Sequence, residues 1–109
     1  MTALLVALGA AVGAPLRFLA AHHLDGRLPL GTLAVNVVGS ALLGLCAGLA
    51  LDGDALALVG VGFCGGFTTY SAFSVQVVDR GRWLGSAYAA GTIAASLVAA
   101  ALGYVIGQA

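Results

Sequence analysis

The chain has 109 residues, of which 61% are hydrophobic and only 7% are charged, and its formal net charge is zero. Soluble domains carry about 25% charged residues, so this composition excludes an ordinary water-exposed surface. No basic cluster of the kind that binds nucleic acid is present. We therefore expect one all-α membrane domain over residues 1–109, with the lipid bilayer as its surroundings and no nucleic acid as a partner.

Four apolar segments are long enough to cross a bilayer core, which takes roughly 20 helical residues. They cover about 3–21, 30–51, 55–78 and 83–106. The first could be a cleaved signal sequence, but no basic residue precedes it and three spans follow, which favours a retained helix. The polar connections are short, so neighbouring helices run antiparallel in a single four-helix bundle.

The arginines all fall on one side of this bundle. Two loops and the last turn of the first span hold them, as Arg17, Arg27, Arg80 and Arg82. The opposite side holds Asp52 and Asp54. Positively charged loops stay in the cytoplasm, so the pattern predicts a multi-pass protein of the cell (inner) membrane with both termini outside.

Every span carries two glycines four residues apart, on one helix face. The pairs are Gly9/Gly13, Gly44/Gly48, Gly62/Gly66 and Gly103/Gly107. Such faces let helix backbones touch within lipid, so the pattern predicts close packing. Four short helices enclose little interior space, and a pore would therefore require an oligomer.

The third span contains the most unusual segment, residues 62–74 (GFCGGFTTYSAFS). Adjacent glycines and β-branched threonines both weaken a helix. One interpretation is a continuous helix with a glycine packing face. We favour a helix broken into 56–64 and about 69–78, because glycines and hydroxyls coincide at mid-depth. Carbonyls freed at such a break suit a small cation, and the N-terminus of the second half suits an anion.

Other polar side chains lie at membrane depth. For Thr92 and Ser96, four residues apart, hydrogen bonds between helices are the favoured explanation. For the amide of Asn36 a functional role is favoured. Arg17 either extends to the interface or creates a positive vestibule for anions, and Gln76 is expected to mark an entrance.

The sequence lacks the residues that several other functions require. No carboxylate lies inside a span, so a carboxylate proton relay is excluded. Cys46 and Cys64 form no metal-binding motif and are expected to be buried thiols. No nucleophile–base pair is evident, so an enzyme is not expected.

The assembled residues resemble the Fluc (CrcB) family of fluoride channels. The likeness covers nearly the whole chain and is carried by residues 13–18 (GAPLRF), 31–40 (GTLAVNVVGS) and, most specifically, 62–74. The sequence departs from the family pattern at three positions. Tyr70 replaces the usual Phe, Ala72 the usual Thr, and Gln76 a frequent Glu.

The resemblance implies passive fluoride export through an antiparallel, dual-topology dimer with two pores. It also implies a structural sodium ion, not transported, held by the backbone carbonyls of Gly65 and Thr68 of both subunits. The anion pathway would comprise Asn36, Tyr70, Ser71, Phe73, Thr92 and Ser96. Arg17 would match the basic residue near the vestibule.

Two alternatives belong to other classes of protein. A small multidrug-type transporter also has four spans, but it needs a membrane carboxylate that this chain lacks. A structural membrane subunit without conduction would tolerate replacement of Asn36 or Phe73. The one-sided arginines and the altered aromatic positions lead us to expect a dimer with a homologous subunit of opposite orientation.

Overall fold

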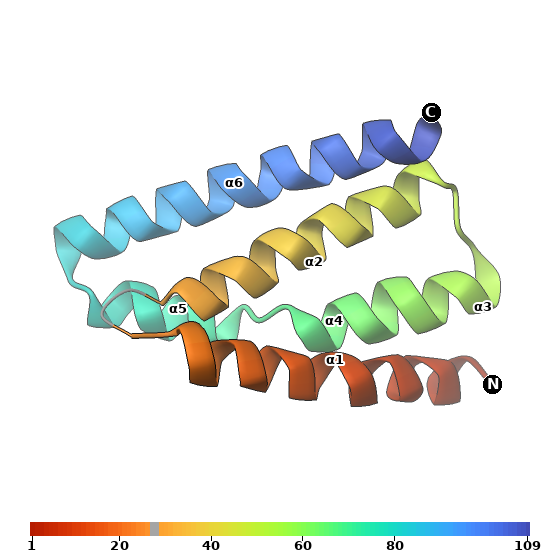
Figure 1. The fold of residues 1–109 in the computed structure, drawn as a ribbon, viewed down its shortest axis with the longest axis horizontal. Coiled ribbons are helices and arrows are strands. Elements are labelled where there is room, and N and C mark those ends of the chain that lie inside the picture. Colours follow the sequence, from red (N-terminus) through yellow and green to blue (C-terminus); the bar gives the residue numbers. More distant parts are fainter. Residues whose placement is uncertain (27–28) are drawn as a thin grey trace.

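A computed structural model of the chain describes residues 1–26 and 29–109. The helices are α1 (Thr2–Leu24), α2 (Leu30–Gly48), α3 (Gly53–Ala55), η1 (Leu56–Cys64), α4 (Gly65–Phe67), α5 (Ser71–Asp79) and α6 (Arg82–Gln108) (Figure 1). Four segments of the described chain are long and apolar enough to cross a membrane, and the third of them, Gly53–Asp79, comprises α3, η1, α4 and α5. The prediction of four spans is confirmed.

The span boundaries differ modestly from the prediction. α1 continues through His22 and His23 to Leu24, whereas α2 ends at Gly48 and not at residue 51. The histidines extend the helix because nothing before Asp25 stops it, and Asp25 adopts an extended conformation with ψ 130°. α6 is the longest helix and runs to Gln108.

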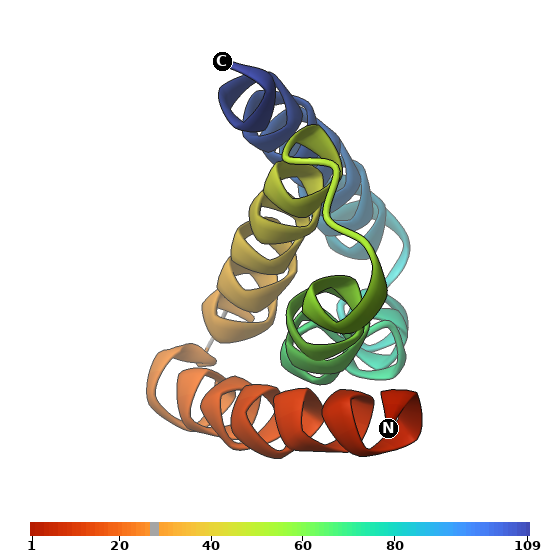
Figure 2. The same ribbon diagram turned by 90° about the vertical axis from the view of Figure 1, so that its right-hand side faces the viewer.

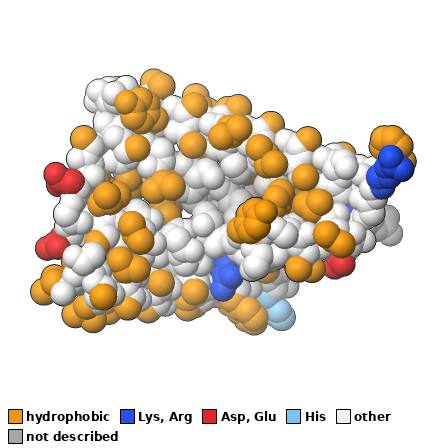
Figure 3. All heavy atoms as spheres, turned by 180° about the vertical axis from the view of Figure 1, so that it is seen from behind, with side chains coloured by type: hydrophobic (Ala, Val, Ile, Leu, Met, Phe, Trp, Pro, Cys, Tyr) orange, Lys and Arg blue, Asp and Glu red, His pale blue; other side chains and the backbone are white. Residues whose placement is uncertain are grey.

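Successive spans run in opposite directions along the molecule. Both termini and α3 lie at one end, and the connections from α1 to α2 and from α5 to α6 lie at the other (Figure 1). Hydrophobic side chains are spread along the whole length of the face in Figure 3, between backbone and other side chains, and most charged side chains lie near its two ends. Of the four arginines, Arg27 lies outside the described residues.

The helices associate as two pairs. α1 packs against η1 and α4, and α2 packs against α6, while contact between the two pairs is sparser (Figure 2). The predicted glycine faces make these pairs. A Cβ on Gly9 or Gly13 would collide with the carbonyls of Leu58 or Phe63 across the first pair. The arrangement is reciprocal, since a Cβ on Gly66 would lie 2.9 Å from the Cα of Ala10.

In the second pair, α2 and α6 also approach closely at glycines. Side chains on Gly44 and Gly48 would collide with carbonyls of α6, and one on Gly103 with a carbonyl of α2. A Cβ on Gly107 would lie 2.7 Å from the carbonyl oxygen of Leu45. Backbone contact of this kind gives dispersion attraction where lipid supplies no hydrophobic driving force between helices.

The third span is broken, as expected, but the position of the break was predicted wrongly. Helical structure continues through Gly65 and Gly66 to Phe67, and the second half begins at Ser71. Thr68 is extended, with φ −86° and ψ 163°. Glycine weakens a helix, yet here Gly66 is held in one by its packing on α1. The interruption therefore falls at residues 68–70.

The glycine faces generate a matched pair of substitutions. Gly13→Ala places a methyl group against the Phe63 carbonyl, so we expect a loss of stability of about 1–3 kcal/mol. Gly91→Ala, on α6, has no neighbouring atom within 4 Å and should leave stability unchanged or slightly raised. Thermal unfolding in detergent micelles checks both variants. Equal melting temperatures for the two would contradict the packing described here.

Candidate functional site

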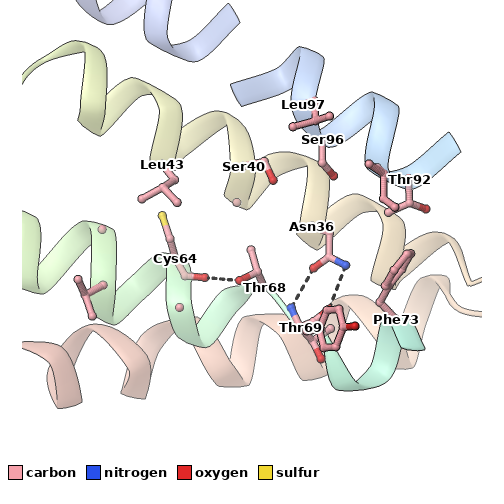
Figure 4. Close-up of a pocket in the computed structure, with 16 residues that line it drawn as sticks. Asn36, Ser40, Leu43, Cys64, Thr68, Thr69, Phe73, Thr92, Ser96 and Leu97 are labelled. Carbon is pink, nitrogen blue, oxygen red and sulfur yellow. Dashed lines mark hydrogen bonds between the residues drawn. The ribbon is translucent and has the colours of Figure 1, made fainter. Parts of the chain in front are cut away.

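A pocket of about 600 Å³ opens between the α2–α6 pair and the third span. Figure 4 shows Asn36 and Ser40 reaching into it from α2, and Thr92 and Ser96 from α6, above the break at Thr68 and Thr69. The pocket brings together most of the residues singled out from the sequence. These are Asn36, Gly65, Thr68, Tyr70, Phe73, Thr92 and Ser96.

Three residues singled out from the sequence do not line this pocket. Ser71 is exposed, with its hydroxyl oxygen 3.5 Å from that of Thr69. Arg17 on α1 and Gln76 on α5 are half-buried elsewhere. Within one chain, therefore, neither of the two residues expected at the vestibule contributes to the pocket.

Asn36 clamps the broken helix to α2. Its Nδ2 donates a hydrogen bond of 3.1 Å to the carbonyl oxygen of Thr69, and the Thr69 N–H donates one of 2.9 Å to its Oδ1 (Figure 4). Thr69 in turn accepts a 3.1 Å hydrogen bond from Ala72 N on its Oγ1, as a side-chain cap does at a helix start. Only the second N–H of the Asn36 amide is left over for another acceptor.

The hydrogen bonds of Asn36 and of the preceding helical turn leave several backbone carbonyls without a backbone hydrogen bond. Thr68 donates both its N–H (2.9 Å) and its hydroxyl (2.8 Å) to the carbonyl of Cys64. The Thr69 N–H, which would continue the helix, goes to Asn36. In the described part of the chain, no backbone N–H bonds to the carbonyls of residues 65–68. Gly65 also faces open space, since a Cβ there would meet nothing within 4 Å.

A row of hydroxyls runs along one face of α6. Tyr88, Thr92 and Ser96 are spaced four residues apart, and their oxygens are buried without a hydrogen-bond partner among residues 1–26 and 29–109. Tyr88 and Thr92 lie near one another but do not meet hydrogen-bond geometry. Tyr88 was missed from the sequence, although its spacing of four from Thr92 was a signal that could have found it. Unpaired hydroxyls at membrane depth are costly, so they mark a place where another acceptor can bind.

Aromatic rings flank the same space. The Tyr70 and Phe73 ring centroids lie 6.4 Å apart, and those of Phe73 and Tyr88 lie 5.7 Å apart. Tyr70 is 82% exposed, so most of its ring has no cover within this chain. Ring edges are electropositive and can complement an anion without carrying a charge.

The donor set of this site suits small inorganic ions. Hydroxyls, an amide N–H and ring edges offer positive partial charges to an anion, and the uncommitted carbonyls offer oxygen to a hard cation. The described residues hold no group of three or more His, Cys, Asp or Glu side chains that could bind a metal ion. A cation at the break would therefore rely on backbone oxygens.

Comparison with known proteins shows which family the chain resembles. The model of the family described as "CrcB-like protein, Camphor Resistance (CrcB)" matches residues 4–104. The fluoride-specific ion channel FluC 2 of Rhodococcus jostii is 44% identical over 110 residues, covering 95% of this chain and 96% of that protein. The fluoride-specific ion channel FluC 1 of Frankia casuarinae is 42% identical over 126 residues, covering 100% and 98%. With nearly its whole length matched, the chain belongs to the CrcB family.

Proposed function

We propose that this chain is a subunit of a fluoride-specific ion channel of the cell (inner) membrane. The observation that carries the proposal is the row of buried, unpartnered hydroxyls of Tyr88, Thr92 and Ser96 on α6. Thr92 and Ser96 line the pocket at the clamped break. The relatives quoted above, both named as fluoride-specific ion channels, support it. The absence of any catalytic constellation in the sequence agrees with a channel and not an enzyme.

Fluoride is small and strongly hydrated, so a pore must replace its water shell with many hydrogen-bond donors. Hydroxyls, ring edges and the spare N–H of Asn36 can do so without a fixed charge that would trap the ion. Conduction requires binding that is favourable at entry and weak enough for release. A row of neutral donors along α6 meets both requirements.

Transport by this chain is passive export. The spans hold no carboxylate at mid-depth that could couple fluoride to protons, because the four aspartates lie at residues 25, 52, 54 and 79, at the ends of the spans. The same observation argues against a small multidrug-type transporter. Fluoride enters cells as a weak acid and is trapped as the anion, so a passive channel lowers its cytoplasmic concentration.

The working unit is an antiparallel dimer. The pocket is open on one side, and Tyr70 is largely uncovered in the single chain. A second subunit laid against this side would close the pocket and cover the ring. Two such contacts in one dimer would form two fluoride pathways.

The partner is a homologous subunit of opposite orientation. Arg80 and Arg82 lie at one end of the molecule, and Asp52 and Asp54 lie near the other, so the positive-inside rule favours one orientation with both termini outside. An antiparallel dimer of identical chains would place half of them against that rule. The names of the two relatives carry the numbers 2 and 1, consistent with more than one such chain in an organism.

A structural sodium ion fits the break. Its ligands would be the backbone carbonyls of Gly65 and Thr68, which accept no backbone hydrogen bond within the described residues. The open space in front of Gly65 allows the same carbonyls of a partner to approach. Bound there, the ion would supply positive charge that holds two helix breaks together, and it would not be transported.

Fluoride efflux from liposomes tests the proposed function. We expect fluoride to leave vesicles that contain this chain with its homologous partner subunit, without any proton gradient. A multidrug-type transporter would require a proton gradient, and a non-conducting subunit would give no flux. Absence of fluoride flux both for the chain alone and with its partner would remove the channel function. A fluoride-conducting dimer of this chain alone would contradict the requirement for a partner.

The Asn36 clamp provides a second test. Asn36→Ala removes two hydrogen bonds, each with a net contribution of about 0.5–1.5 kcal/mol, so amide hydrogen exchange at Thr69 and Ala72 should accelerate roughly 10- to 100-fold. Fluoride flux should fall in the same Asn36→Ala variant. Ser40→Ala removes a hydroxyl from the same pocket without touching the clamp and should leave exchange unchanged. Unaltered exchange in Asn36→Ala would refute the clamp.

The dimer contact at Gly65 provides a third test. Gly65→Ala meets no atom of its own chain within 4 Å, so the subunit should fold normally. Its methyl group would obstruct the partner's carbonyls, and we expect the dimer fraction to fall and to lose any dependence on sodium. Gly91→Ala is the matched control, with equally open surroundings. Single-molecule subunit counting distinguishes them, and equal dimer fractions would contradict the proposed contact.

A further inference from the structure

An exposed pair of an arginine and a tryptophan stands at the start of α6. The guanidinium of Arg82 lies over the ring of Trp83, 5.7 Å from the ring centroid, and Trp83 is 82% exposed. Neither residue lines the pocket at the break. A planar guanidinium that stacks on an aromatic face keeps its N–H edge available for a bidentate contact with a phosphate. The pair therefore presents an oriented cation at the surface of the subunit.

A second arginine is separated from this pair by a single residue. Arg80 follows α5, and Gly81, with φ 83°, leads the chain into α6. Cα atoms two residues apart are separated by at most about 7 Å, so the two arginines lie in one place. The Nε of Arg80 has no hydrogen-bond partner among residues 1–26 and 29–109. Arg80, Arg82 and Trp83 thus form one patch, which we call the α5–α6 patch.

The carboxylates at this end of the molecule offset the charge of the patch only in part. Residues 79–83 contain two arginines and one aspartate, the exposed Asp79, which leaves a net charge of +1. Asp25 lies in the connection from α1 to α2 at the same end (Figure 1). Its two oxygens accept hydrogen bonds of 3.0 Å each from the N–H and the hydroxyl of Thr32. The α5–α6 patch therefore remains positive and suits an anionic partner.

The patch lies where a span meets the surface of the bilayer. α6 is long and apolar enough to cross a membrane, and its first residue is Arg82. Tryptophan prefers the depth of the lipid headgroups, because its ring is apolar and its indole N–H is polar. The anions fixed at this depth are the phosphates of lipids. The positive-inside rule directs this end toward the cytoplasm, and the cytoplasmic leaflet carries anionic lipids.

We propose that the α5–α6 patch binds the headgroup of an anionic phospholipid. The Arg82 guanidinium contacts the phosphate, the Trp83 ring lies against the upper part of the lipid, and Arg80 adds positive charge. Each arginine near an anionic membrane surface favours association roughly fivefold. Because Asp79 opposes one of the two arginines, we expect a net preference for anionic over zwitterionic lipid of roughly fivefold. This preference is independent of fluoride conduction.

Quenching of tryptophan fluorescence measures the preference. Trp83 is the only tryptophan of the chain, so its emission reports on the lipid beside it. The full chain is reconstituted in phosphatidylcholine vesicles that contain either brominated phosphatidylglycerol or brominated phosphatidylcholine, with the bromine near the headgroup end of the acyl chain. We expect half-maximal quenching at a roughly fivefold lower content of the brominated phosphatidylglycerol.

Three variants separate a bound headgroup from general attraction between charges. Arg82→Gln should abolish most of the preference, and Asp79→Asn should raise it roughly fivefold. Arg82→Lys is the charge-matched control. An ammonium group cannot make the bidentate contact of a guanidinium, so this variant should lose at least about half of the preference.

Four results would overturn the proposal. Equal quenching by the two brominated lipids would show that the patch has no preference for an anionic headgroup. A preference unchanged in Arg82→Lys would assign the effect to surface charge in general. Absence of quenching by either lipid would show that another subunit covers Trp83. Relief of quenching by inorganic phosphate, but not by sodium chloride at equal ionic strength, would identify a site for the free ion. None of these results involves fluoride flux, so the channel function is tested separately.

Discussion

The pair of hydrogen bonds between Asn36 and Thr69 is the interaction on which the site depends. A helix can be interrupted in lipid only where other groups satisfy the freed backbone or where it lines a wet path. The Asn36 amide satisfies one N–H and one carbonyl at the break. Because the Thr69 N–H bonds to Asn36, it does not reach the carbonyl of Gly65, which it would meet in a continuous helix, and that carbonyl is left free. The Asn36 amide thus fixes the break and frees one of the carbonyls beside it.

The glycine faces determine the helix packing within which the hydrogen bonds between Asn36 and Thr69 form. They bring α1 against η1 and α4, and α2 against α6, so closely that a methyl group would collide with the opposing backbone. The two tight pairs leave the pocket between them, with α6 presenting its hydroxyls toward the break. The pocket gathers Asn36, Ser40, Thr92 and Ser96 beside the break, and hydrophobic side chains are spread over the outer face in Figure 3.

Much of the fold could be predicted from the sequence because its signals are local. Span lengths follow from hydropathy, and the glycine pairs from a spacing of four. The exact break could not be predicted, because Gly66 is kept helical by Ala10, a contact between separate helices. The partner of Asn36 lies 33 residues away and follows only from the packing of α2 on the third span. Tyr88 could have been identified from its spacing of four residues from Thr92. The absence of Arg17 from the pocket, in contrast, depends on the direction of α1.

We propose that a clamped helix break and a row of neutral donors form a pathway selective for fluoride. The reversal potential across a planar bilayer, measured with opposed gradients of fluoride and chloride, tests it most directly. We expect a potential that follows the fluoride gradient and does not change with the chloride gradient. A potential that follows chloride, or one set equally by both anions, would contradict it.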